Sequence, residues 1–122
     1  MSTADTKALI EEGVANFQAE VPALKQLRLV IELELRGRGD IQLFRVELPG
    51  PKVTKGTTDD ERLRVTVPRT MFNVLAADGE LADWHEAYDH GHLKVEGDPR
   101  VQRLIGQVIV KREARSHLKK AH

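Results

Sequence analysis

The feature that most constrains the fold is a change of hydrophobic period at Leu27. From Leu27 to Leu35 every second residue is a leucine or an isoleucine, and the residues between them are mostly charged. Because successive side chains of a strand point to opposite faces, this pattern predicts a half-buried strand. The turn-forming residues 37–40 (GRGD) follow, and residues 41–48 have Phe44, Val46 and Leu48 on one face. Together the segments predict an antiparallel hairpin, so the chain should fold around a sheet.

Three shorter segments predict the remaining strands. Residues 63–67 alternate between apolar and polar side chains, and residues 92–96 do so with Leu93 and Val95 on one face. Residues 52–54 lie between a proline-glycine turn and a polar loop, which is typical of a short strand. The sheet should therefore have about five strands and be largely antiparallel.

Four other segments have apolar residues at the three- and four-residue spacing of a helix. Pro22 ends or kinks the first helix, because proline removes a backbone donor and clashes with the preceding turn. Asp98 followed by Pro99 predicts the start of the last helix, since Asp caps a helix and proline suits its first position. The expected helices cover residues 6–20, 68–78, 81–90 and 99–110, and a polar tail follows. Strand and helix periods occupy separate segments, so we expect an α+β fold with a five-stranded sheet covered on one face by helices.

Length and cysteine content limit the function classes. The 122 residues suffice for one compact domain, residues 1–122, and no cysteine is available for disulfides, thiolate nucleophiles or zinc-thiolate sites. No segment is apolar enough to cross a bilayer, and the start MSTADTKALIEEG lacks the basic-then-apolar order of a secretion signal. We therefore expect a cytoplasmic protein.

The net charge of zero hides two oppositely charged segments. Residues 78–98 carry seven acidic side chains against one lysine, and residues 99–122 carry seven basic side chains against Glu113 alone. Such neighbours either complement each other or form solvated faces. Nucleic acid is a poor candidate partner, because the chain is not basic overall and has only five aromatic residues.

Catalytic motifs are not evident in the sequence. Ser2 and Ser116 are the only serines, and neither lies in a recognisable serine-histidine-carboxylate arrangement. The glycines never form a phosphate-binding loop ahead of a helix. We therefore predict that the protein is not an enzyme and needs no cofactor.

A group of histidines is the main competing signal. His85 and His90 are five residues apart on the expected third helix. This spacing separates them by about 140° around the helix axis, so they do not form a two-histidine zinc motif. A site made by Glu86, His90 and His92 across the turn at Gly91 remains an alternative, because carboxylate and imidazole are suitable metal ligands. We predict no metal site.

The second half of the chain resembles a known family. The block TVPRTMFNVLAADGELADWHEAYDHGHLKVEGDPRVQRLIGQVI resembles the sterol carrier protein type 2 family, and the similarity extends over about residues 27–110. The family typically has glycine-lysine-leucine-lysine-isoleucine-glutamate-glycine-aspartate where this chain reads GHLKVEGD at 91–98, so His92 and Val95 are departures. Before Gly91 the family is usually plainer, whereas this chain has Trp84, His85, Tyr88 and His90. The chain ends in Lys-Lys-Ala-His rather than in a peroxisomal signal, so that location is not implied.

The resemblance implies a non-catalytic protein with an apolar cavity between helices and sheet, which would accept a fatty acyl chain, a sterol or another lipid. Burial of apolar surface would hold such a ligand, so the site needs few polar groups. A filled core that serves a protein-interaction module is the alternative with the same fold. We expect the cavity wall to consist of Leu33, Leu35, Phe72, Leu75, Trp84, Leu104, Ile105 and Val108.

The basic end of the chain suggests a contact with membranes. Clustered cations gain on the order of 1 kcal/mol each near an anionic lipid surface. Leu118 is the only large apolar residue among them, so any docking should be weak and transient. The alternative is a solvated tail that offsets the acidic segment. The basic residues in question are Lys111, Arg112, Arg115, Lys119 and Lys120.

Overall fold

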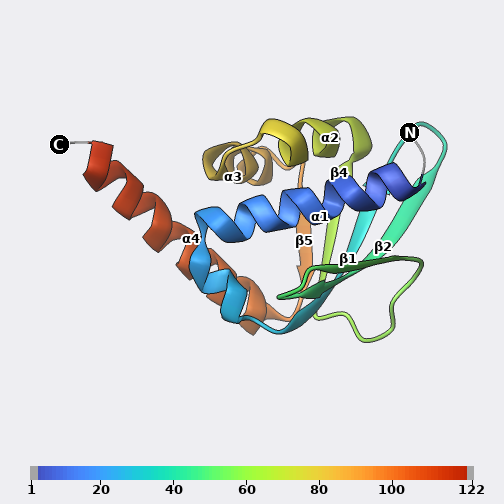
Figure 1. Ribbon diagram of the computed structural model, residues 1–122, viewed down its shortest axis with the longest axis horizontal. Helices are drawn as coiled ribbons and strands as arrows, with labels where there is room; N and C mark the ends of the chain where they lie inside the picture. Colours follow the sequence, from blue (N-terminus) through green and yellow to red (C-terminus); the bar gives the residue numbers. More distant parts are fainter. Residues whose placement is uncertain (1–2, 121–122) are drawn as a thin grey trace.

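The computed structural model describes the backbone of residues 3–120 and the side chains of residues 4–114. Helices cover one face of a five-stranded sheet, which confirms the predicted α+β class (Figure 1). In chain order the elements are α1 (Thr3–Glu20), the 3-10 helix η1 (Pro22–Gln26), β1 (Leu29–Arg36), β2 (Ile41–Leu48), β3 (Lys52–Lys55), β4 (Leu63–Pro68), α2 (Arg69–Asp78), α3 (Leu81–Asp89), β5 (Lys94–Gly97) and α4 (Pro99–Lys120).

The strand order is β3-β2-β1-β4-β5. The predicted hairpin forms β1 and β2, in which Leu33 lies opposite Phe44. The pair β1 and β4 is parallel, whereas the other three pairs are antiparallel. The sheet is therefore largely antiparallel, as predicted, with one parallel pair at its centre.

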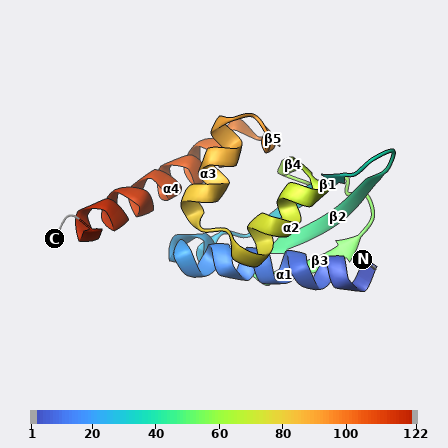
Figure 2. The same cartoon turned by 90° about the horizontal axis from the view of Figure 1, so that it is seen from above.

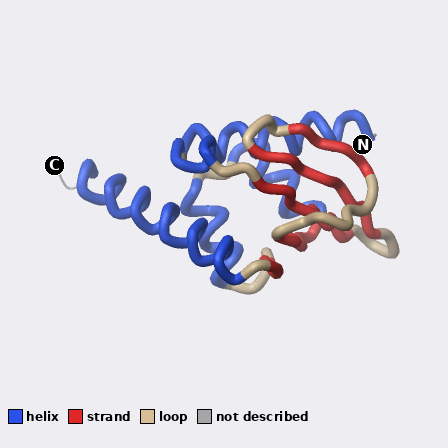
Figure 3. Tube along the Cα trace, turned by 90° about the horizontal axis from the view of Figure 1, so that it is seen from below, coloured by secondary structure: helices blue, strands red, loops and turns tan. Residues whose placement is uncertain are grey.

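The helices lie on one side of the sheet. α1 crosses this face, and α2 and α3 lie beside it on the same side (Figures 1 and 2). Seen from below, the strands lie in front of the helices, so none of the described helices covers the opposite face (Figure 3). α4 begins beside β5 and its far end extends away from the body of the molecule (Figures 1 and 2).

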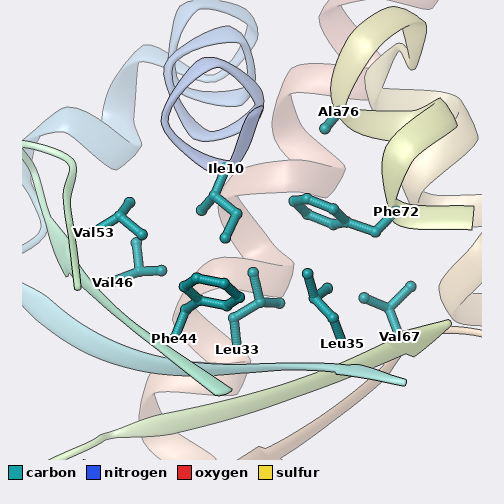
Figure 4. Close-up of a cluster of buried hydrophobic side chains, with 9 residues drawn as sticks. All are labelled: Ile10, Leu33, Leu35, Phe44, Val46, Val53, Val67, Phe72 and Ala76. Atoms are coloured by element: carbon teal, nitrogen blue, oxygen red, sulfur yellow. The ribbon is translucent and has the colours of Figure 1, made fainter. Parts of the chain in front are cut away.

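The main core lies between α1, α2 and the sheet. Its side chains point from both layers toward the same space (Figure 4). Phe44 is fully buried there, because every second residue of β2 faces α1. The core residues are Ile10, Leu33, Leu35, Phe44, Val46, Val53, Val67, Phe72 and Ala76.

The uncovered face of the sheet is polar. Glu32 of β1 is only 2% exposed, and its carboxylate accepts a hydrogen bond from Arg64 Nε at 2.6 Å. This contact raises the pKa of the Arg64 guanidinium above its usual value. On β2, Arg45 pairs with Glu47 and with Asp60 at 2.7 Å each. Ion pairs between charged side chains thus occupy the face of the sheet that the described helices leave uncovered.

Several boundaries differ from the sequence prediction. β1 begins at Leu29, because Leu27 closes the 3-10 helix by donating its backbone N–H to the Leu24 carbonyl. β5 occupies Lys94–Gly97 rather than 92–96, since His92 and Leu93 bond back to the end of α3 through the carbonyl of Ala87.

The expectation of a polar tail after residue 110 is wrong at the backbone level. α4 continues to Lys120. Residues 111–120 contain lysine, arginine, glutamate, alanine and leucine, which favour helices, and neither glycine nor proline interrupts them. No helix in the described part of the chain has the length and the apolar run that crossing a bilayer requires.

Candidate functional site

A cavity of about 350 Å³ lies between the helices and the covered face of the sheet. Ile31 and Leu33 of β1 and Val46 and Leu48 of β2 contribute to its sheet side. These are inward positions of the two strands, so the alternation that builds the core also builds the cavity. Its volume falls at the lower end of the range usual for small-molecule sites.

The helical walls come from both ends of the chain. α1 contributes Ile10, Val14 and Phe17 from the stripe that faces the sheet. α4 contributes Ile105 and Ile109. The remaining walls include Leu24 of η1, Leu63 and Val65 of β4, Leu81 of α3, Leu93, and Val95 of β5.

Three aromatic rings pack together in the wall. The centroid of Trp84 lies 5.9 Å from that of Phe17 and 6.1 Å from that of Phe72, and both pairs are edge-to-face. They come from α3, α1 and α2, so this cluster joins the three helices at the cavity. Trp84 is the only tryptophan in the chain, which makes it a specific fluorescent reporter of the cavity.

Four side chains in the wall are polar: those of Gln18, His85, Tyr88 and Gln102. Gln18 is buried and donates its amide to the Pro49 carbonyl at 2.8 Å. Gln102 donates its amide to the Gly97 carbonyl at 3.1 Å. These bonds satisfy polar groups beside an otherwise apolar space, so the cavity suits a mainly apolar ligand.

The solvent-exposed part of the described cavity wall lies on α3 and α4. The exposed residues of the wall are Tyr88 on α3 together with Gly106 and Val110 on α4. Tyr88 is 50% exposed and Val110 is 58% exposed. The wall residues on α1, η1 and the sheet are buried or half-buried. We call this exposed part of the wall the opening of the cavity.

His85 connects these two helices beside the opening. Its Nδ1 lies 2.6 Å from Glu113 Oε1 on α4, and its Nε2 lies 3.6 Å from Asp89 Oδ2 on α3. Both ring nitrogens thus face carboxylates. Glu113 was not among the expected site residues, because the sequence pattern predicts a polar tail there rather than a continuing helix.

Side-chain carboxylates accept hydrogen bonds from backbone N–H groups at the start of α3 and at the start of α4. The N–H of Leu81 donates to the Glu20 carboxylate at 2.6 Å, which ties the start of α3 to the end of α1. The N–H of Arg100 donates to Asp98 Oδ1 at 2.9 Å, as the predicted cap of α4 requires. That bond, with a further contribution from Arg62, holds the pKa of the Asp98 carboxyl below its usual value.

Half of the expected wall residues line the cavity. Leu33, Phe72, Trp84 and Ile105 do so. Many wall residues that were not expected from the sequence lie on α1, β2 and β4. The apolar stripe of α1 was visible in the sequence, but nothing in its spacing shows which space it faces.

The other four expected residues lie elsewhere. Leu35 is in the main core, and Leu75 packs with Ala87 and Leu93 in a separate cluster. Val108 packs in a cluster of residues from η1, α3 and α4. Leu104 is 44% exposed on α4. None of these four residues is among the described residues that line the cavity.

The histidines of the acidic segment lie in two different places: His85 is in the cavity wall, and His90 and His92 are not. His90 and His92 stack edge-to-face with centroids 6.2 Å apart and border a shallow hollow with Glu86. Within the side chains that the structure describes, no group of three or more histidines and carboxylates could hold a metal ion. Of the basic residues near the chain end, Lys111 is exposed and Arg112 is half-buried, whereas the side chains of Arg115, Lys119 and Lys120 lie outside the described residues.

Comparisons with known proteins agree with the resemblance seen in the sequence. No family model matches the chain, and no curated protein matches it either. Solved structures do match in fold. The sterol carrier protein domain 2 of Helicoverpa armigera aligns with a TM-score of 0.60 at 13% identity, over 88% of this chain and 85% of that chain.

Two further solved structures extend the comparison. Sterol carrier protein 2 from Aedes aegypti, in complex with the C16 fatty acid palmitate, aligns with a TM-score of 0.56 at 16% identity, over 89% of this chain and 96% of that chain. A ubiquinone synthesis protein, UbiJ-SCP2, aligns with a TM-score of 0.54 at 21% identity, over 93% of this chain and 96% of that chain. The chain therefore has the fold of sterol carrier protein 2 domains.

Proposed function

We propose that this chain, which has the sterol carrier protein 2 fold, is a non-catalytic carrier that holds a lipid in the cavity beneath α1, α3 and α4. The observation that carries the proposal is the apolar cavity of about 350 Å³, whose exposed wall residues lie on α3 and α4. A solved protein of the same fold contains palmitate, which supports an elongated apolar ligand. Burial of the ligand's apolar surface would supply most of the affinity.

Gly106 offers a direct test of the proposal. It lies in the wall at the opening, and a Cβ at this position would meet no atom within 4 Å. Gly106→Phe should place a ring at the opening without disturbing the fold and should weaken lipid binding at least tenfold, about 1.4 kcal/mol. Gly106→Ala is the matched control, because it also replaces a helical glycine but adds only one methyl group.

Binding would be measured by the change in Trp84 emission on titration with dodecanol. Native mass spectrometry of the purified protein, followed by extraction and identification of any bound lipid, would detect lipid that co-purifies. We expect lipid with the wild-type chain and with Gly106→Ala, and little with Gly106→Phe. If the wild-type chain carries no lipid and Trp84 emission does not respond, the protein-interaction module becomes the better explanation of the fold.

We also propose that the basic end of α4 makes brief contact with anionic membranes during loading. Lys111 is exposed, and the helix continues through the remaining basic positions. A variant in which Lys111, Arg112, Arg115, Lys119 and Lys120 are glutamine keeps helix-favouring residues but removes the charge. Co-sedimentation with anionic and neutral vesicles at low and high salt tests this. Equal sedimentation of both proteins would exclude a membrane role for these residues.

A further inference from the structure

We propose that the cavity selects lipids whose polar end is uncharged, a hydroxyl or a carbonyl, over lipids that end in a carboxylate. This inference rests on the proposed function and concerns the end of the ligand that remains near the opening. Three features of the opening carry it: the absence of a cation from the described wall, two carboxylates around His85, and the orientation of α3.

No lysine or arginine is part of the cavity wall within the described side chains. The basic residues of α4 that the structure describes, Arg100, Arg103, Lys111 and Arg112, all lie outside it. A carboxylate drawn toward an apolar space is costly unless a cation or several donors pair with it. A hydroxyl or carbonyl carries no such penalty and needs one hydrogen bond.

His85 does not supply the missing cation. Its two ring nitrogens already face Glu113 at 2.6 Å and Asp89 at 3.6 Å. If the imidazole is protonated, these three side chains together still carry one negative charge. The carboxylate of a ligand at the opening would therefore be repelled by Glu113 and Asp89.

The direction of α3 adds to this repulsion. Tyr88 and Asp89 are its last two residues, so the carbonyl end of the helix lies beside the opening. The C-terminal end of a helix carries partial negative charge, which disfavours an anion there. The Tyr88 hydroxyl and the Gln102 carboxamide in the same wall can hydrogen-bond an uncharged oxygen.

The test compares two ligands of equal chain length that differ only in the charge of the polar end. Dodecanol and dodecanoate would be titrated into the full chain at about pH 7.5, where the carboxyl is ionised. Trp84 emission reports binding. We expect the wild-type chain to bind dodecanol at least about tenfold more tightly than dodecanoate after correction for their water solubility, about 1.4 kcal/mol.

Two variants test whether residues at the opening cause the preference for dodecanol over dodecanoate. Glu113→Gln removes a carboxylate beside His85 and should reduce the preference for dodecanol severalfold, mainly by strengthening dodecanoate binding. Glu86→Gln removes the same charge from the exposed side of α3 that borders the other hollow, and should leave the preference unchanged. Far-UV circular dichroism of both variants checks that the helices are retained.

The outcomes separate the two proposals. If dodecanoate binds as tightly as dodecanol to the wild-type chain, the selectivity is refuted while lipid binding stands. Equal effects of Glu113→Gln and Glu86→Gln would refute a local role of the opening. If neither ligand binds, the proposed carrier function is itself refuted.

Discussion

At the scale of single residues, Phe44 allows the stability of the fold to be tested independently of the cavity. It is fully buried between α1 and the sheet, but it is not part of the cavity wall. Phe44→Leu should therefore lower the free energy of unfolding by about 1–3 kcal/mol, because it leaves unfilled volume in the core. Urea unfolding measures this loss. Dodecanol affinity should remain unchanged, and a parallel loss of affinity would show that core and cavity are coupled.

Asp98 gives a residue-level prediction about pH. Its folded-state pKa is lowered mainly by the hydrogen bond from the Arg100 N–H, with a smaller contribution from Arg62. A lowered folded-state pKa stabilises the protein above the unfolded value, near pH 4, and this contribution is lost as the pH falls through the folded value. Asp98→Asn keeps a capping oxygen but loses the charge.

The wild-type chain should therefore have a higher melting temperature than Asp98→Asn at pH 7, and the difference should disappear in acid. Thermal unfolding of both proteins between pH 7 and pH 2 measures it. Asp98→Ala is the control, since it removes the cap at every pH. A difference between wild type and Asp98→Asn that persists at pH 2 would contradict the assignment.

At the scale of elements, the close approach of α1 and α2 depends on Gly13. A Cβ at Gly13 would lie 2.9 Å from the Cβ of Ala76, which is 2% exposed. Gly13→Ala should therefore destabilise the protein by about 1–3 kcal/mol through overpacking, although alanine favours helices over glycine. Gly106→Ala on α4 has open space and should be neutral or stabilising by up to about 1 kcal/mol. Chemical denaturation should show a loss of stability for Gly13→Ala and no loss for Gly106→Ala.

Most elements could be predicted from the sequence because their periods are local properties. The alternation in β1 and β2 and the cap at Asp98 place their elements within a few residues. Pairing partners are not local, so the parallel contact of β1 with β4 had no signal in the sequence. Distant segments also form the cavity wall, so only half of the residues expected from the sequence line it. The apolar stripe of α1 was recognised in the sequence, but its position over the sheet depends on packing between distant segments.

At the scale of the whole molecule, α4 should be the least protected wall of the cavity. It packs mainly against η1 and β5, and its far end extends from the body (Figure 1). We expect backbone amides of residues 111–120 to exchange hydrogen faster than those of β1 at the centre of the sheet. Dodecanol should slow exchange in residues 102–110, which border the cavity. Hydrogen-exchange mass spectrometry with and without dodecanol tests both statements, and an unaltered α4 would argue against entry past this helix.

The residues that line the cavity extend along the chain from Ile10 to Val110, so the wall is completed only near the end of synthesis. During synthesis the ribosome releases α1 and all five strands before α4 emerges. Until α4 is made, it cannot cover the apolar cavity-lining surfaces of α1 and the sheet. A nascent chain therefore exposes this surface before α4 has been made. If the protein is the carrier proposed above, a lipid can bind this surface before α4 covers it.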